Sequence, residues 1–281
     1  MGGSKETLMQ SFYGKTAVVT GAASGIGRAI AKRCAQYDMR VVLADIDQSA
    51  LNKTENDLRS VGADVLAILT DVSKPDDVGT LAQKTLDHFG NVHLLFNNAG
   101  VATGSTIWDS TLDDWKWVVG VNMWGVIHGL RVFVPIMIDQ DTECHIVNTA
   151  SVVGLLDKFS SSSYQVTKHA VVAISEQLYH SLVEMKSKVK ASVLCPGWVR
   201  TRILDANRNH PTVNQDILYK DQDLKGDLES GVPPEIVAEH VFRAIHQDKF
   251  YILVNADEYK PLIRMRMENI LEESNPTESD K

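Results

Sequence analysis

The chain has 281 residues, of which 44% are hydrophobic and 23% are charged, and its formal net charge is −8. This composition is ordinary for a globular protein, and the negative charge argues against a surface that binds nucleic acid or anionic membranes. No apolar run comes close to the roughly 20 residues that span a bilayer, and the first residues lack the apolar core of a secretion signal, so we expect no membrane association and a cytoplasmic location.

The length favours one large domain over several small ones. It exceeds the usual single-domain size, but α/β domains of roughly 200–250 residues are common. We expect a dinucleotide-binding and catalytic domain over residues 14–256. A short polar lead-in, residues 1–13, precedes it, and a terminal helix and tail, residues 257–281, follow it.

Three cysteines, Cys34, Cys144 and Cys195, stand far apart in apolar or helical surroundings. Their number is odd, and their spacing fits neither a disulfide framework nor a zinc site. We therefore expect buried thiols in a reducing compartment, and no metal site.

The first predicted element is a strand, residues 16–20, followed by a glycine-rich turn, residues 21–27, and a helix, residues 28–36. This is the context of a dinucleotide-binding loop. Glycines allow a sharp turn and let backbone N–H groups approach a pyrophosphate at the helix N-terminus. The spacing is Gly-x-x-x-Gly-x-Gly, not the commoner Gly-x-Gly-x-x-Gly, and a tight turn without a ligand is the alternative.

The second predicted strand, residues 40–44, ends at Asp45. A carboxylate at this point can accept hydrogen bonds from the ribose hydroxyls of the adenosine, and it would repel a 2′-phosphate. It therefore favours NAD over NADP. The alternative is that Asp45 caps the helix beginning near Gln48, although Asp47 stands closer to that helix.

Strands and helices alternate through the rest of the chain. The further strands are predicted over residues 64–70, 93–96, 144–149, 190–195 and 251–254. The further helices are predicted over residues 75–89, 112–138, 163–186, 233–247 and 259–273. This alternation is typical of βαβ units, so we predict an α/β fold with a doubly wound parallel sheet and helices on both faces.

Several strand ends and one helix carry polar residues that call for a role. Asp71-Val72 and Asn97-Asn98-Ala99-Gly100 follow two of the strands, where the second segment could also be a simple turn. Asn122 lies among apolar positions of a predicted helix, and a buried amide must be hydrogen-bonded. Residues 201–232 are polar and irregular after another strand end, which favours a mobile substrate lid, although an ordinary solvated loop explains them equally well.

Tyr164 and Lys168 lie one helical turn apart on one face of the predicted helix 163–186. A phenol with an unperturbed pKa of about 10 is a poor acid–base catalyst at neutral pH. A fixed neighbouring cation would favour the phenolate and lower its pKa. A lone Tyr-x-x-x-Lys also occurs by chance in many helices.

Taken together, these motifs resemble the short-chain dehydrogenase/reductase family over roughly residues 14–202. The matches are the loop from Thr20 to Gly27, the segment Asn97–Gly100, Asn122, Ser151, Tyr164, Lys168, and Pro196-Gly197 with Thr201. The resemblance implies a Rossmann-like single domain and a nicotinamide cofactor, NAD+/NADH. It also implies a homodimer or homotetramer built on the helices near 112–138 and 163–186.

The same resemblance assigns roles to individual residues. Tyr164 would be the acid–base group, Lys168 would lower its pKa and hold the nicotinamide ribose, Ser151 would orient the substrate oxygen, and Asn122 would anchor a water beside Lys168. The implied cofactor residues are Gly21, Ser24, Gly25, Ile26, Gly27, Asp45, Ile46, Asp71, Val72, Asn98, Ala99, Gly100, Tyr164, Lys168, Pro196, Gly197, Val199 and Thr201.

The leading functional hypothesis is hydride transfer between NAD(H) and a secondary, apolar alcohol or its ketone. It depends on a set of apolar residues that could also be core: Val153, Leu155, Leu156, Phe159, Trp198, Ile203 and Leu204. The alternatives are an NADP-dependent carbonyl reductase and a non-catalytic cofactor-binding scaffold.

Overall fold

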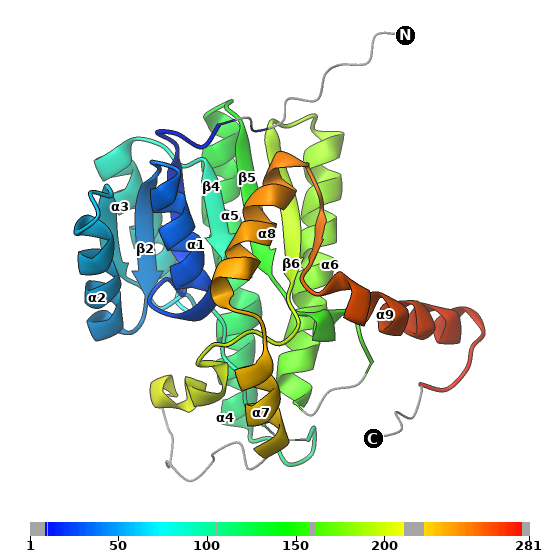
Figure 1. Cartoon of the computed structure of the whole chain (residues 1–281). Helices are drawn as coiled ribbons and strands as arrows, with labels where there is room; N and C mark the ends of the chain where they lie inside the picture. Colours follow the sequence, from blue (N-terminus) through cyan, green and yellow to red (C-terminus); the bar gives the residue numbers. More distant parts are fainter. Residues whose placement is uncertain (1–8, 10, 105, 158–160, 211–221, 277–281) are drawn as a thin grey trace, which may run out of the picture.

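The chain folds around one seven-stranded parallel sheet. The computed structural model describes residues 9, 11–104, 106–157, 161–210 and 222–276. The strands lie in the order β3-β2-β1-β4-β5-β6-β7, and every neighbouring pair is parallel (Figure 1). They are β1 (Thr16–Thr20), β2 (Arg40–Asp45), β3 (Val65–Leu69), β4 (Leu94–Asn97), β5 (Cys144–Thr149), β6 (Val189–Cys195) and β7 (Tyr251–Leu253).

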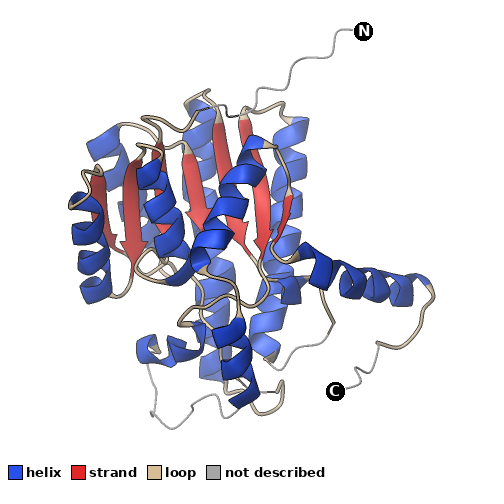
Figure 2. Cartoon of the chain, in the orientation of Figure 1, coloured by secondary structure: helices blue, strands red, loops and turns tan. Residues whose placement is uncertain are grey.

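Helices cover both faces of the sheet (Figure 2). They are α1 (Gly25–Gln36), α2 (Gln48–Arg59), α3 (Pro75–Phe89), α4 (Leu112–Val119), α5 (Gly125–Asp139), α6 (Ser162–Glu184), α7 (Gln222–Ser230), α8 (Pro234–His246) and α9 (Ala256–Leu271). Helices α1, α2 and α8 share a core with one face, and α3, α5 and α6 share a core with the other. The predicted doubly wound α/β fold is confirmed.

The strand residues explain why both faces need cover. Successive side chains of a strand point to opposite faces, and in β1 Ala17 and Val19 belong to one core while Val18 belongs to the other. The sequence of a strand that is buried on both faces is an unbroken run of apolar residues. This pattern is typical of a parallel sheet between two helical layers.

The strand order reverses between β1 and β4, and this reversal determines where in the fold a ligand-binding site is expected. From β1 the chain winds outward to β3, and from β4 it winds outward in the other direction to β7. In open α/β sheets, ligands bind at such a point, outside the carboxyl ends of the strands.

Several elements of the structure differ from the prediction, among them α9, which begins at Ala256, and α7, which was not predicted. Helix α1 begins at Gly25, because the last glycines of the loop already form its first turn. The predicted helix 112–138 is interrupted by a π-helical segment, Gly120–Trp124, which contains Asn122. Segments of this kind often occur at functional sites.

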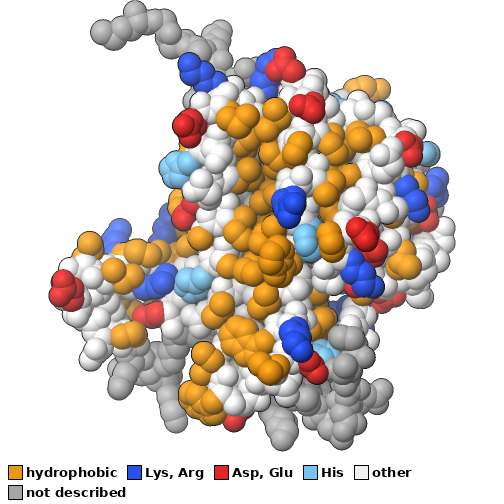
Figure 3. All heavy atoms as spheres, turned by 180° about the vertical axis from the view of Figure 1, so that it is seen from behind, with side chains coloured by type: hydrophobic (Ala, Val, Ile, Leu, Met, Phe, Trp, Pro, Cys, Tyr) orange, Lys and Arg blue, Asp and Glu red, His pale blue; other side chains and the backbone are white. Residues whose placement is uncertain are grey.

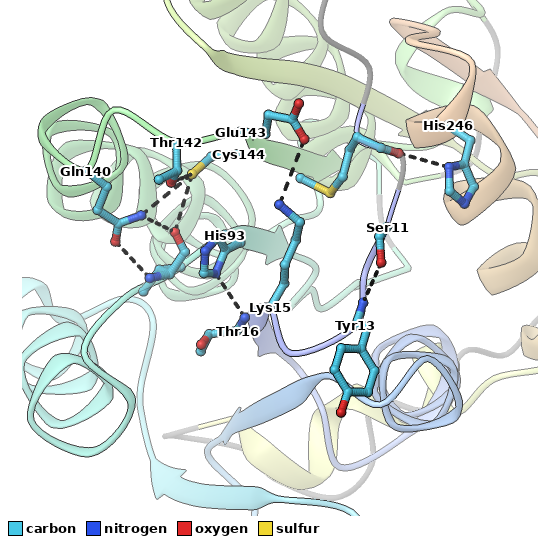
Figure 4. Close-up of polar contacts among 12 residues, drawn as sticks. Ser11, Tyr13, Lys15, Thr16, His93, Gln140, Thr142, Glu143, Cys144 and His246 are labelled. Atoms are coloured by element: carbon cyan, nitrogen blue, oxygen red, sulfur yellow. Dashed lines mark hydrogen bonds and ion pairs between the residues drawn. The ribbon is translucent and has the colours of Figure 1, made fainter.

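The predicted lead-in and lid are more ordered than expected where they are described. Phe12 is 3% exposed and packs against Phe242, with ring centroids 4.9 Å apart, so this part of the lead-in belongs to the core. His246 Nδ1 donates to the Met9 carbonyl at 3.0 Å (Figure 4). Residues 203–209 form a 3-10 helix. Residues 1–8, 10, 211–221 and 277–281 lie outside the described part.

One described stretch, Leu112–Asp139, is long and apolar enough to cross a membrane, contrary to the expectation from the sequence. The difference arises because isolated polar residues such as Asn122 and His128 interrupt the apolar run, yet an 18-residue window of this stretch still has a mean hydropathy of 1.5. Core helices have the same properties, and Phe133 and Met137 of this stretch are buried against the sheet.

The three thiols are as predicted. Cys34, Cys144 and Cys195 are all buried and none forms a disulfide. Burial raises the pKa of the Cys195 thiol to about 12, so it remains protonated at neutral pH.

His145 is a buried, neutral histidine that makes the fold sensitive to acid. Ser192 Oγ donates its proton to the Lys249 carbonyl at 2.7 Å, so His145 Nε2, also 2.7 Å from that oxygen, must be the donor of the pair. Burial lowers the pKa of His145 to about 4.

We predict that the protein loses stability as the pH falls from about 6.5 towards 4. The unfolded state binds a proton at this histidine near pH 6.5 and the folded state does not, so acid favours unfolding. Between pH 7 and 5.5 the loss attributable to His145 is roughly 1 kcal/mol. Denaturant unfolding at the two pH values measures it, and His145→Gln should show a smaller loss. An equal loss in both proteins would refute the assignment.

Candidate active site

A cleft of about 380 Å³ opens at the carboxyl ends of the strands. Of the predicted site residues, Gly27 and Asn122 lie off its surface. The others line it: Gly21, Ser24, Gly25, Ile26, Asp45, Ile46, Asp71, Val72, Asn98, Ala99, Gly100, Ser151, Tyr164, Lys168, Pro196, Gly197, Val199 and Thr201. Residues spread over the sequence thus meet in one hollow.

The glycine-rich loop requires its glycines. Gly21 and Gly25 have φ values of +66° and +51°, which favour glycine. A Cβ at Gly27 would lie 2.2 Å from the Gly21 carbonyl oxygen, so Gly27 shapes the loop from behind the cleft. Ser24 caps α1 without a side-chain hydrogen bond, and the first turn of α1 contains no acidic residue. This helix N-terminus suits an anion.

Asp45 is positioned by the same loop. Its Oδ2 accepts a hydrogen bond from the Ala23 N–H at 2.9 Å, and its Oδ1 accepts one from the Asp47 N–H at 3.0 Å. Asp47, not Asp45, caps α2, because its Oδ1 accepts from the Ala50 N–H at 3.0 Å. The cap alternative for Asp45 is therefore wrong. Burial raises the pKa of the Asp45 carboxyl, which lines the cleft beside Ile46.

Ser151, Tyr164 and Lys168 meet at the other end of the cleft. Ser151 follows β5, and Tyr164 and Lys168 lie one turn apart in α6. Lys168 Nζ donates to the Thr149 carbonyl at 2.9 Å and lies 5.3 Å from the centroid of the Tyr164 ring. Ser151 makes a hydrogen bond to Tyr164 that lowers the pKa of the phenol.

Burial dominates the ionisation of this pair. It raises the pKa of Tyr164 to about 12, against the smaller effect of Ser151, and it lowers the pKa of Lys168 to about 8. The expected lowering of the phenol pKa is therefore not seen in the free chain, because removal of both groups from water disfavours both charges. At neutral pH Lys168 still carries its proton for the most part, whereas the Tyr164 phenol stays neutral.

Asn122 is fully hydrogen-bonded, as its burial required. Its Oδ1 accepts from the Val101 N–H at 2.8 Å, and its Nδ2 donates to the Val101 carbonyl at 2.9 Å and to Thr167 Oγ1 at 3.1 Å. The side chain joins the loop after β4 to α6. A Cβ at Gly100 in that loop would lie 3.5 Å from Lys168 Nζ and 3.6 Å from Asn122 Oδ1, so this loop borders both residues.

Apolar side chains form the wall around Ser151 and Tyr164. From the predicted apolar set, Val153, Leu156, Trp198, Ile203 and Leu204 line the cleft. Leu155 packs into a separate core cluster, and Phe159 lies outside the described residues. The lining residues that the sequence interpretation missed include Trp117, Arg208, Leu228 and Tyr259.

Tyr259 shows that α9 is part of this wall. A Cβ at Gly197 would lie 2.3 Å from a Tyr259 ring carbon, so the helix packs directly on the turn after β6. Arg266 Nη1 of the same helix donates to the Leu155 carbonyl at 3.0 Å. Helix α9 thus joins the loops that follow β5 and β6. No sequence signal separated Tyr259 from an ordinary helix residue.

Comparison with known proteins gives a consistent result. A family model described as short chain dehydrogenase matches residues 15–212. A 1-deoxy-11-beta-hydroxypentalenate dehydrogenase of Streptomyces avermitilis is 38% identical over 247 residues, 86% of this chain and 85% of that protein. A short chain dehydrogenase/reductase from Burkholderia phymatum, solved in complex with NAD, is 45% identical with a TM-score of 0.93, covering 97% and 100% of the two chains. A variant of actinorhodin polyketide ketoreductase in complex with NADPH is 26% identical with a TM-score of 0.75, covering 86% and 95%.

We predict that Asn122→Ala lowers the free energy of unfolding by about 2 kcal/mol or more, because it leaves the buried Val101 N–H and carbonyl without partners. Equilibrium unfolding in denaturant measures the change. As a control, Asn52→Ala removes an exposed amide oxygen that accepts from Gln48, and it should change the free energy by no more than about 0.5 kcal/mol. If both variants lose the same amount, Asn122 does not hold the loop.

Proposed function

This chain belongs to the short-chain dehydrogenase/reductase family, and from that premise we propose that it transfers a hydride between NAD(H) and a secondary, apolar alcohol or the matching ketone. One observation carries the proposal. Ser151, Tyr164 and Lys168 lie in the same cleft as the glycine-rich loop, and apolar side chains surround them.

The residues of the cleft fit a dinucleotide. The absence of a side chain at Gly21 lets the loop approach the segment after β4 closely, since a Cβ would lie 2.9 Å from the Ala99 Cα, and both segments border the cleft. The N-terminus of α1 would take the pyrophosphate, Asp45 the adenosine ribose, Asp71 and Val72 the adenine, and Gly197, Val199 and Thr201 the nicotinamide end. When bound, the nicotinamide accepts or donates the hydride.

The protein itself would orient the substrate and move the proton. Tyr164 Oη would exchange a proton with the substrate oxygen, and Ser151 Oγ would hold that oxygen at hydrogen-bonding distance. The phenol starts from a pKa of about 12, so it is a proton donor in the free chain. The Lys168 ammonium would favour the phenolate while the proton leaves, and Asn122 would keep a water path beside Lys168 open.

The substrate class follows from the cleft wall. Val153, Leu156, Trp198, Ile203 and Leu204 present apolar surface next to Ser151 and Tyr164, with Trp117 and Tyr259. A pocket of this kind favours apolar molecules with one polar group at the reacting carbon. The similarity to a dehydrogenase of a hydroxylated compound supports an alcohol or ketone substrate.

Asp45 supports NAD as the cofactor, as does the NAD complex of the 45% identical relative. The NADPH complex of the more distant ketoreductase supports the alternative, an NADP-dependent carbonyl reductase. A non-catalytic scaffold is the other alternative, but a binding module has no need for the joint presence of Ser151, Tyr164 and Lys168.

We also propose that the protein is a cytoplasmic homodimer or homotetramer. Trp124, Val166, Tyr179 and Val183 are 44%, 50%, 38% and 53% exposed on or next to α5 and α6. The face covered by α3, α5 and α6 shows a broad apolar area, which a second copy would cover (Figure 3). Three thiols without disulfides support a reducing compartment.

We predict that Tyr164→Phe lowers the turnover of secondary apolar alcohols at least about 100-fold and leaves NADH affinity nearly unchanged. The variant removes the proton-exchanging hydroxyl and keeps the ring. NADH absorbance reports turnover, and NADH fluorescence reports binding. Tyr13→Phe, at a tyrosine that is 76% exposed, serves as a control. Turnover that survives in Tyr164→Phe would remove the proposed role, and unchanged biological activity without turnover would favour the scaffold.

We predict that Asp45→Ala lowers the ratio of kcat/KM with NAD to kcat/KM with NADP by about tenfold or more, because it removes both a ribose acceptor and a charge that repels a 2′-phosphate. The exposed Asp76 at the start of α3 gives a control variant, Asp76→Ala, whose ratio should not change. Should Asp45→Ala keep the wild-type ratio, the explanation of cofactor choice fails.

A further inference from the structure

A strap of chain, residues 202–210, borders the cleft from the carboxyl ends of the strands. It contains the 3-10 helix Ile203–Asn209 and lies below the sheet, beside α4, in Figure 1. The strap lines the cleft with both apolar and polar residues, which are Arg202, Ile203, Leu204, Ala206, Arg208 and Asn209. The apolar members belong to the wall described above, and the two arginines have no role in it.

One side of the strap is fastened to α4. Ala206 is 4% exposed and packs in an apolar cluster with Val101 and Val118. His210 Nε2 lies 3.4 Å from Asp114 Oδ1, and the His210 ring lies edge-on to Trp117 with centroids 4.5 Å apart. These contacts hold the strap over the substrate end of the cleft.

The other side of the strap reaches the adenosine end. Arg208 Nη1 donates to the Asp205 carbonyl at 2.9 Å, which holds the guanidinium against its own turn. Arg208 lines the same cleft as Ser24 and Asp45. Its charge interacts with that of Asp205 in its own turn and with those of Asp47 and Asp45, at the start of α2 and the end of β2. A guanidinium of the strap therefore shares the adenosine end with the carboxylate that is proposed to bind the ribose.

We propose that Arg208 is a cofactor-binding residue, whose guanidinium pairs with the phosphates of the adenosine diphosphate half of the dinucleotide. The inference rests on the proposed function, because it concerns the same cofactor. A guanidinium presents several donors in a planar fork that matches phosphate oxygens. The glycine-rich loop and α1 supply donors to the pyrophosphate from one side, and Arg208 would supply a charge from the strap.

Arg202 is less suited to this role than Arg208. Its Nε lies 3.4 Å from Asp205 Oδ2, so a neighbouring carboxylate already compensates its charge. The carboxylates that interact with Arg208 include Asp47 and Asp45 at the cofactor end, in addition to Asp205. With Asp45 in place, its charge opposes a 2′-phosphate, and without it Arg208 would be available as the partner of that phosphate.

The contact would couple the two ends of the cleft. Arg208 and the substrate-wall residues Ile203, Leu204 and Ala206 belong to the same short strap. A cofactor phosphate that holds Arg208 would also hold this wall in place, so the substrate would meet a better-formed pocket after the cofactor than before it.

The test is a set of binding measurements on the full chain. Arg208→Gln should weaken the binding of NADH and of ADP about tenfold, measured by fluorescence and calorimetry, and should leave the binding of adenosine unchanged. Arg200→Gln, in the same loop but outside the cleft lining, is the matched control. Thermal unfolding checks that both variants remain folded.

A second arm separates phosphate pairing from a general effect of charge. Asp45→Asn should gain affinity for NADPH, and Arg208→Gln added to it should remove most of that gain. Wild-type affinity for NADH and ADP in Arg208→Gln would overturn the inference. A wild-type chain that binds neither ligand would overturn both the inference and the proposed function. A chain without turnover whose NADH binding still depends on Arg208 would support the inference and overturn only the function.

Discussion

The close approach of the chain segments after β1 and β4 is the constraint on which the site depends. Gly21 lies so near Ala99 that a side chain there would clash, and the Asn98 and Ala99 N–H groups both donate to Thr20 Oγ1, at 2.9 and 3.1 Å. This contact lies at the carboxyl ends of β1 and β4, where the strand order reverses. The N-terminus of α1 faces the cleft beside it. Every proposed cofactor contact is arranged around that edge.

Removal from water is the second feature that organises the site, and it shifts the pKa values of Lys168 and Tyr164 in opposite directions. The buried Lys168 loses its proton more readily than a lysine in water, and the buried phenol of Tyr164 keeps its proton more firmly. Water does not screen charges well around this buried pair. The electrostatic effect of a bound cation is therefore greater here than on a solvated surface. Apolar walls therefore contribute to the chemistry as well as to substrate fit.

The sequence predicted the sheet well because parallel strands buried on both faces are continuous apolar runs, as in β2. The family resemblance, together with the polar residues that directly follow strands, predicted most of the residues that meet in the cleft. The sequence could not predict the π-helical break at Asn122, the packing of Tyr259 on Gly197 or the position of Arg208, because these depend on tertiary contacts between distant segments. The raised pKa of Tyr164 was missed for the same reason: the effect of burial is absent from a local Tyr-x-x-x-Lys spacing.

Helix α9 has a consequence for how the protein is made. Its Tyr259 covers the turn at Gly197, and its Arg266 binds the Leu155 carbonyl, so two loops that flank the reacting groups depend on a segment that is synthesised after both of them. Domains fold from the N-terminus during synthesis, and β1 to β4 can pair while the ribosome still holds the rest. The dinucleotide half can therefore form early on the nascent chain, whereas the substrate half reaches its final shape only once α9 has emerged from the ribosome.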